Sequence, residues 1–175
     1  MEVAFVAPEL RRLDELTGEV LCCALFEDER PPLGVASLVD WRLGGALARQ
    51  LVRGFATGRR GEVLLLPARG KLPFDKVLVF GLGPRAGFDE AVYRETLGAM
   101  LGTLEGLCAR AAVVELPGRH AGAIDASRAA ELLSELTAER PLHEAWTLVE
   151  PPDDQRRVAA HLGEERRRVR RADPG

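Results

Sequence analysis

Two glycine-bearing junctions are the parts of this chain whose residue types could hold a ligand. Gly81-Leu82-Gly83 ends an apolar run, and Gly44-Gly45 opens a helical pattern just after Asp40. Glycine lets a ligand approach the backbone closely, and free amides at the start of a helix attract anions. Ligands of open α/β sheets often lie where parallel strands end. The pattern predicts a crevice for a phosphorylated ligand, lined by Asp40, Gly44, Gly45, Gly81, Leu82 and Gly83.

A purely structural interpretation of the same junctions stays open. Two glycines in the first turn of a helix also allow close packing against a sheet, and Asp40 suits the cap of that helix better than an acid catalyst. Residues 81–86 fit the dinucleotide fingerprint GxGxx[GA], but Pro84 and Arg85 interrupt its turn. We therefore expect no nicotinamide cofactor at this junction.

The residue types that catalyse hydrolysis are not arranged for that chemistry. His120, His143 and His161 do not stand at zinc-ligand spacing from other ligands. The sequence contains no GxSxG, HExxH or P-loop motif. We expect no catalytic residue, no metal site and no cofactor.

Two tryptophans and one arginine cluster are candidates for an interface with a protein. Trp41 and Trp146 suit either packing or an interface. The cluster fits a solvated helix face, an acidic surface of another chain or phosphate contacts with nucleic acid, and Glu164 and Glu165 lower its field. The arginines of the cluster are Arg166, Arg167, Arg168, Arg170 and Arg171.

The composition indicates a folded protein without a membrane span. The chain has 175 residues, 46% of them apolar, and its net charge of −3 gives no general attraction to nucleic acid or to an anionic membrane. Its three cysteines form no CxxC motif, which favours a reducing compartment. No signal peptide and no run of about 18 apolar residues is present. We expect a cytoplasmic protein.

The hydrophobic periodicity predicts a three-layer α/β/α sandwich around a mixed, largely parallel sheet. Strands are expected at residues 2–7, 19–26, 62–66, 76–80, 111–116 and 145–149. Helices are expected at residues 40–55, 89–110, 125–140 and 153–171, with a short helix or a turn at 10–16 and a hairpin or loop between the third and fourth strands.

The character of the sequence changes after Pro151-Pro152. Residues 151–175 carry seven arginines against five acidic residues, in a helical pattern with few apolar anchors. We predict a domain over residues 1–150 and a charged C-terminal helix or tail over residues 151–175.

The order of these motifs resembles the N-terminal domain of the leucyl aminopeptidases, which is similar in fold to the macro (ADP-ribose-binding) domains. Three features carry the resemblance: Leu43-Gly44-Gly45 opening a helix, Gly58-x-x-Gly61-Glu62 before a strand, and Gly81-Leu82-Gly83 after one. It spans residues 19–150, and the tail resembles the helix that leads to the peptidase domain.

The resemblance implies a protein without peptidase chemistry. In that family the chemistry belongs to a C-terminal domain with two metal ions around an Asn-Thr-Asp-Ala-Glu-Gly-Arg motif, which this sequence lacks. The family's N-terminal domain is non-catalytic and supports oligomer assembly. Macro domains bind ADP-ribose between two loops, at positions similar to residues 43–47 and 81–83, and usually carry an Asn where this chain has Val39-Asp40-Trp41-Arg42.

We therefore expect a non-catalytic assembly or regulatory module that binds itself or another protein. The alternative is a binding module for ADP-ribose or another phosphorylated nucleotide.

Overall fold

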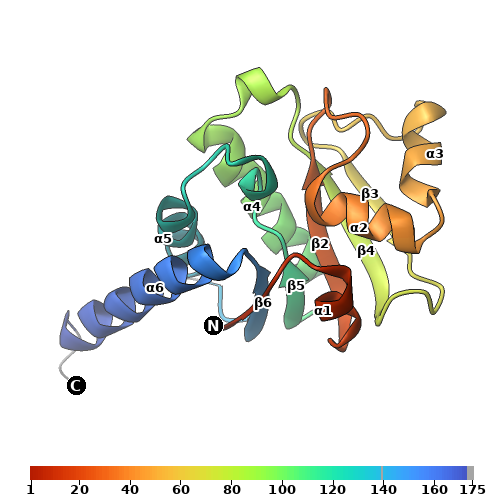
Figure 1. Ribbon diagram of the computed structural model, residues 1–175. Coiled ribbons are helices and arrows are strands. Elements are labelled where there is room, and N and C mark those ends of the chain that lie inside the picture. Colours follow the sequence, from red (N-terminus) through yellow and green to blue (C-terminus); the bar gives the residue numbers. More distant parts are fainter. Residues whose placement is uncertain (139, 173–175) are drawn as a thin grey trace.

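The computed structural model describes residues 1–138 and 140–172, and side chains as far as residue 163. One sheet contains β1 (Glu2–Val6), β6 (Ala145–Val149), β5 (Ala111–Val114), β2 (Gly18–Leu25), β4 (Phe74–Gly81) and β3 (Val63–Pro67), in this spatial order (Figure 1). All neighbouring strands are parallel except β3 and β4, which form an antiparallel hairpin. The predicted mixed, largely parallel sheet is confirmed.

Helices cover both faces of this sheet. One face packs against α1 (Leu10–Asp14), α2 (Gly34–Arg42) and α3 (Ala46–Val52), and the other against α4 (Glu90–Gly106), α5 (Ala126–Thr137) and α6 (Pro152–Ala172). Two short 3-10 helices are η1 (Arg85–Gly87) and η2 (Arg119–Ala121). Successive residues of β2 alternate between the two cores, so Cys22 and Cys23 face opposite layers. The three-layer architecture is therefore as predicted.

The prediction of one helix over residues 40–55 is wrong. The chain forms α2 and α3 instead, because Gly44 and Gly45 have left-handed φ values of 65° and 76° that end the first helix. Asp40 does cap a helix, but from an unexpected position. It lies in α2, and its Oδ1 accepts a hydrogen bond of 3.0 Å from the backbone N–H of Ala48 in α3.

The starts of α4 and α5 are fixed by the side chains that cap them. Asp89 accepts a 2.9 Å hydrogen bond from the N–H of Val92 at the start of α4. Asp125 accepts a 2.9 Å hydrogen bond from the N–H of Ser127 at the start of α5. Both side chains accept hydrogen bonds from otherwise unpaired amides, which is the geometry of a helix N-cap.

The last helix packs on α5 with its buried side chains Val158 and Leu162. An ion pair of 2.9 Å between Arg157 and Asp125 adds to this contact. The predicted arginine cluster of residues 166–171 lies outside the side chains that the structure describes, and the domain boundary at residue 150 stays a prediction. No helix of the described part of the chain is long and apolar enough to cross a membrane.

Candidate functional site

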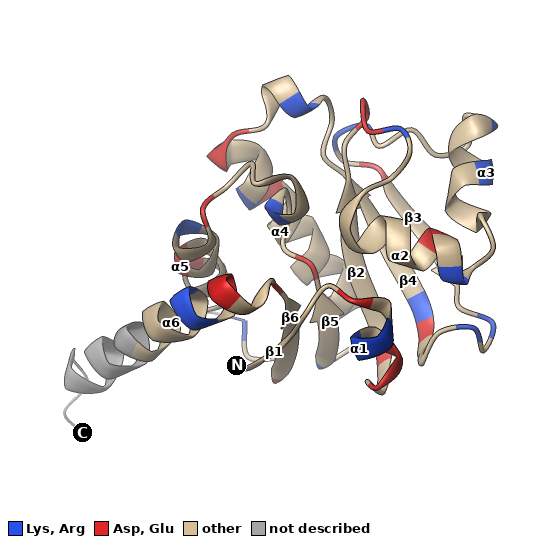
Figure 2. Ribbon diagram, viewed as in Figure 1, with Lys and Arg blue, Asp and Glu red and all other residues tan. Residues whose placement is uncertain are grey.

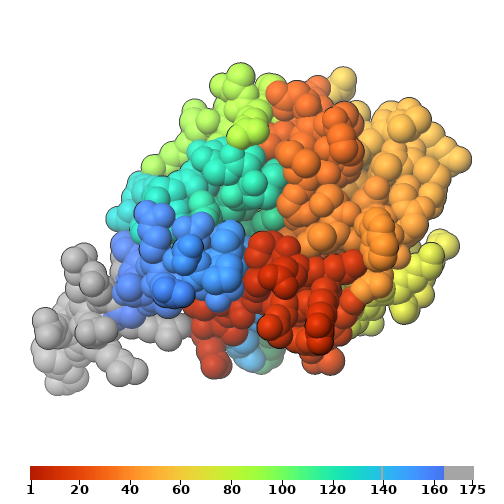
Figure 3. Space-filling view, viewed as in Figure 1, coloured from red at the N-terminus to blue at the C-terminus, as the bar shows by residue number. Residues whose placement is uncertain are grey.

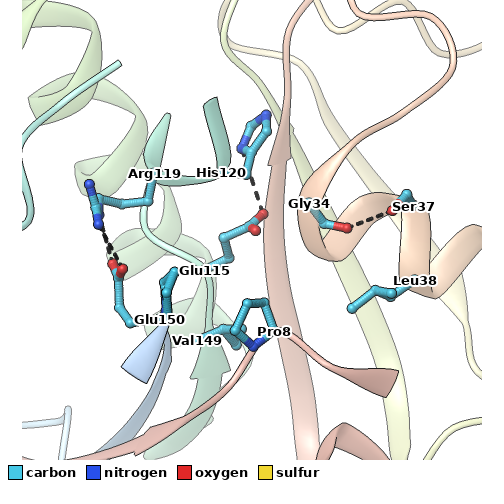
Figure 4. Close-up of a pocket in the computed structure, with 10 residues that line it drawn as sticks. Pro8, Gly34, Ser37, Leu38, Glu115, Arg119, His120, Val149 and Glu150 are labelled. Carbon is cyan, nitrogen blue, oxygen red and sulfur yellow. Dashed lines mark hydrogen bonds and ion pairs between the residues drawn. The ribbon is translucent and has the colours of Figure 1, made fainter. Parts of the chain in front are cut away.

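A cavity of about 350 Å³ opens at the carboxyl ends of β5 and β6, beside the start of α2 (Figure 4). This end of parallel strands is where α/β sheets most often bind ligands. The apolar walls come from Pro8, Leu38, Val149 and Pro151. The polar lining comes from Ser37, Glu115, Arg119, His120 and Glu150.

Two strand ends place the two carboxylates of this cavity. Glu115 directly follows β5, and its N–H continues the ladder with a 2.9 Å hydrogen bond to the carbonyl of Cys22. Glu150 directly follows β6, and its N–H donates to the carbonyl of Val6 at 3.0 Å. Because β5 and β6 are parallel neighbours, both carboxylates reach the same edge of the sheet.

Glu115 is buried and joins the sheet to α2. Its Oε1 accepts a 3.0 Å hydrogen bond from the N–H of Val35, in the first turn of that helix. Burial raises the pKa of Glu115 to about 7, and the charge of His120 and the Val35 hydrogen bond only partly oppose this.

Gly34 makes this close approach possible. Its φ is +57°, and a Cβ at this position would overlap His120 Cβ and lie 2.7 Å from Glu115 Oε1. Any other residue would push the start of α2 away from β5, so glycine is required here by conformation and by space.

His120 lies between two carboxylates. Its Nε2 is 2.8 Å from Oε2 of Glu29, and its Nδ1 is 3.8 Å from Oε2 of Glu115. Burial lowers the pKa of His120, but the hydrogen bond to Glu29 and the negative charges outweigh it, so the pKa is raised. Nδ1 of His120 and Oε2 of Glu115 are buried without a hydrogen-bond partner among the described residues.

Arg119 is fully engaged in a buried ion-pair network. Its Nε and Nη2 bind both oxygens of Glu150 at 2.8 Å, and Nη2 also binds Asp154 of α6 at 2.7 Å. Its Nη1 donates to the carbonyl of Ile124 at 2.6 Å. Arg119 therefore ties α6 to the sheet and has little capacity left for a ligand.

The titratable groups in the lining of this cavity are two carboxylates, Glu115 and Glu150, together with Arg119 and His120. Within residues 1–138 and 140–163, no three side chains of His, Cys, Asp or Glu are grouped to hold a metal ion. The Ser37 hydroxyl donates to the carbonyl of Gly34 at 2.8 Å, and among the described side chains it has no hydrogen bond to a His, Asp or Glu. The volume and polar lining of this cavity are suited to binding a ligand.

The two glycine junctions do not meet in a common crevice. Gly44 lies beside Lys71, which precedes β4, whereas Gly81-Leu82-Gly83 lies at the far end of β4. Eight strand residues span about 26 Å. The six residues predicted to line one site therefore lie at opposite ends of the sheet, and ligand binding at either junction alone stays a prediction.

The amides of both junctions are already occupied. The N–H groups of Gly44 and Gly45 donate to the carbonyls of Trp41 and Asp40, at 3.1 and 2.8 Å. Those of Gly81, Leu82 and Gly83 donate to the carbonyls of Glu62, Leu25 and Gly58. A Cβ on Gly81 would overlap the carbonyl oxygen of Arg59, so close backbone packing explains that glycine.

Basic side chains gather beside Gly44, where no cation was predicted. Arg49, Arg69 and Lys71 line a second cavity of about 270 Å³. In Figure 2 the blue basic positions on α3 and on the β3–β4 turn mark these two segments. Arg49 Nη1 donates to the Gly44 carbonyl at 2.6 Å. None of the three makes an ion pair with a carboxylate of the described residues. Any anion here would be held by side chains.

The two tryptophans have different environments. Trp41 is 71% exposed, with the Arg42 guanidinium 5.6 Å from its ring centre, and it remains a candidate for an interface. Trp146 is 1% exposed and packs edge-on against His143 in the core. The prediction that Trp146 lies at an interface is wrong, because its ring is enclosed by the domain.

The carboxylate-lined cavity was missed by the sequence interpretation. Its signal is an apolar strand followed at once by an acid, in Val113-Val114-Glu115 and in Leu148-Val149-Glu150. Glu29 and His120 carry no such signal, because 91 positions separate them in the chain.

The fold defines the class of protein as macrodomain-like. The chain is similar to an Oceanobacillus iheyensis macrodomain with ADP, with a TM-score of 0.69 and 12% identity over 89% of this chain and 88% of that one. It is also similar to a tomato leucine aminopeptidase, with a TM-score of 0.63 and 14% identity over 93% of this chain and 35% of that one. At such identities the likeness shows the fold.

Sequence similarity then gives the family. Residues 24–140 match the cytosol aminopeptidase family, N-terminal domain, and the chain belongs to this family. A probable cytosol aminopeptidase of Pseudomonas paraeruginosa is 36% identical over 104 residues, which cover 59% of this chain and 21% of that protein. The match spans about a fifth of that relative's length. The resemblance seen in the ordered glycine motifs is confirmed.

Proposed function

We propose that the chain is a non-catalytic assembly or regulatory module that acts through self-association or through a partner protein. Its membership of an N-terminal domain family supports this role, and the names of its relatives support a cytoplasmic location. The observation that carries the proposal is the distribution of exposed apolar side chains. Of nine large exposed hydrophobic residues in the described part, six lie between residues 33 and 65: Leu33, Trp41, Val52, Phe55, Val63 and Leu65.

These six residues belong to α2, α3, β3 and the loops around them. In Figure 3 the orange surface of this stretch covers the right-hand end of the molecule, away from α6. Single exposed apolar side chains are common, but a concentration at one end of a domain is typical of a surface that another protein covers.

The edge strand β3 also presents backbone hydrogen-bonding groups on this surface. Among the strands that the structure describes, β3 pairs only with β4. The N–H of Gly81 donates to the carbonyl of Glu62 and that of Ala68 to the carbonyl of Asp75, which shows which residues face β4. Because bonded pairs alternate in an antiparallel ladder, the N–H and C=O groups of Val63 and Leu65 face the open edge. Such an edge accepts an added strand, and Pro67, which has no N–H, limits its length.

Light scattering during size-exclusion chromatography over a range of concentrations tests the proposal. We expect the wild type to form a dimer or larger oligomer and Leu65→Lys to shift it toward the monomer. Leu142→Lys is the matched control, because Leu142 is 50% exposed against 51% for Leu65 but lies between α5 and β6. A strict monomer at every concentration, with no partner captured by the wild type and lost by Leu65→Lys, would contradict the proposal.

A phosphorylated nucleotide is the second candidate, and the cavity of Arg49, Arg69 and Lys71 favours it. Three cations without a carboxylate partner attract phosphate groups, and a macrodomain of similar fold has been solved with ADP. Calorimetry with ADP-ribose should show binding that Arg69→Ala and Lys71→Ala weaken. Arg11→Ala, on the remote helix α1, should not change it. The absence of heat at millimolar ADP-ribose would remove this candidate.

A further inference from the structure

The buried polar atoms of the cavity at the ends of β5 and β6 point to a ligand of definite chemistry. Oε2 of Glu115 and Nδ1 of His120 lie 3.8 Å apart, and both lack a hydrogen-bond partner within the described chain. Both residues line the cavity. Buried polar groups in native proteins are almost always paired, so the two atoms require a third group between them.

The missing group must donate hydrogen bonds. The other oxygen of Glu115 is held by the N–H of Val35, which fixes the carboxylate with Oε2 free. Glu29 is fixed in the same way, because its Oε1 accepts a 2.7 Å hydrogen bond from the N–H of Leu33 while Oε2 meets His120 Nε2. In the neutral imidazole with its proton on Nε2, toward Glu29, Nδ1 is an acceptor, and this is the form to which a donor from a ligand would bind. Oε2 of Glu115 and Nδ1 of His120 are then two hydrogen-bond acceptors that face the same part of the cavity.

The charges around the space favour a cation. The nearby acids are Glu29, Glu115, Glu150 and Asp154, and Arg119 is paired with the last two. The next cation, Arg85, donates to the carbonyl of Ala121 and does not line this cavity. His120 lies between Glu29 and Glu115 and can compensate at most one of these two charges, so a phosphate or carboxylate would still meet net negative charge, whereas an ammonium group would neutralise it.

The remaining walls describe the rest of the ligand. Pro8, Leu38, Val149 and Pro151 are apolar, and about 350 Å³ lies at the small end of ligand sites. We propose that this cavity binds a small molecule with a primary ammonium group on a short apolar body, the ammonium bridging Glu115 and His120. This cavity borders the stretch 33–65 through Gly34, Ser37 and Leu38 of α2, and it shares no lining residue with the cavity of Arg49.

A set of probes with one shape and different charges tests the inference on the intact chain. The probes are 3-methylbutylammonium, 3-methyl-1-butanol, 3-methylbutyrate and ADP, each titrated while the backbone amide signal of Val35 is followed by NMR. We expect the ammonium probe to shift this signal saturably and the alcohol to bind about tenfold more weakly, since it loses a charge-assisted hydrogen bond. The two anions should leave the signal unchanged.

Glu115→Gln is the informative variant, because its amide oxygen can still accept from Val35 while the charge is lost. It should weaken ammonium binding about tenfold. Glu144→Gln removes an exposed acid at the opposite, amino end of β6 and should have no effect.

If Glu115→Gln does not fold, the effect of added salt on probe binding can be measured with the wild type alone. Salt should weaken the ammonium probe more than the alcohol. Three results would overturn the inference: equal affinity for the ammonium and the alcohol, a Val35 shift by either anion, or no shift by any probe at millimolar concentration. The last would mean that the cavity holds water only.

Discussion

Replacing Gly34 by alanine tests the packing between α2 and β5 on which the cavity depends. The added Cβ would overlap His120 Cβ and lie 2.7 Å from Glu115 Oε1, and the residue would keep a φ of +57°. Left-handed backbone costs about 1–2 kcal/mol for a residue with a Cβ, and overpacking in a close-packed interior costs about 1–3 kcal/mol. We expect a loss of about 2–5 kcal/mol in the free energy of unfolding.

Gly54→Ala separates the two contributions. Gly54 has a similar φ of +68°, but nothing lies within 4 Å of the position of its Cβ. This variant should lose only the conformational part, about 1–2 kcal/mol. Urea unfolding of both variants and the wild type measures the difference. If Gly34→Ala loses no more stability than Gly54→Ala, the close contact of α2 with His120 and Glu115 is not a constraint, and the reasoning fails.

Three further predictions concern buried groups. Because burial raises the pKa of Glu115 from 4.5 to about 7, the folded state holds a proton that the unfolded state releases between these values. Stability should therefore fall by up to about 3 kcal/mol as pH rises from 4.5 to 7. The raised pKa of His120 acts in the same direction at the upper end of this window. Glu115→Gln should flatten the fall in urea unfolding, and an unchanged slope would argue against burial as the cause. Arg119→Leu leaves the buried Glu150 carboxylate unpaired and removes one partner of Asp154, and it should lose about 3–5 kcal/mol, with faster hydrogen exchange in α6. Arg157→Leu, whose partners are exposed or half-buried, should lose about 0–1 kcal/mol; equal losses would refute the role of the buried network. Trp146→Phe should lower the midpoint of thermal unfolding and Trp41→Phe should not, since only the first ring is enclosed; the reverse order would contradict the assigned burial.

Local signals predicted most of the elements. The continuous apolar run of β2 indicates a strand buried on both faces, and the apolar periodicity predicts helices at 89–110 and 125–140, where α4 and α5 lie. The break between α2 and α3 was hidden because Leu43, Leu47 and Leu51 keep a four-residue spacing and all pack in one core. A hydrophobic pattern alone cannot distinguish one helix from two that bury the same face.

The site depends on topology that no local pattern contains. Glu115 and Glu150 meet because β5 and β6 are neighbours, and His120 reaches Glu29 across the end of β2. The crevice predicted between the two glycine junctions does not form, for the same reason: Gly44 lies beside Lys71, which precedes β4, and Gly81 ends β4. An aromatic residue suits both a core and an interface, so the burial of Trp146 required the packed fold.

Hydrogen exchange at the amides of Val63 and Leu65, measured over a range of protein concentrations, tests the proposed assembly role most directly. Both N–H groups face the open edge of β3, so they should exchange rapidly in a dilute monomer. The account predicts that their exchange slows as concentration rises, while the exposed loop around Leu142 is unaffected. Rapid exchange at Val63 and Leu65 at every concentration, in the oligomer as in the monomer, would contradict it.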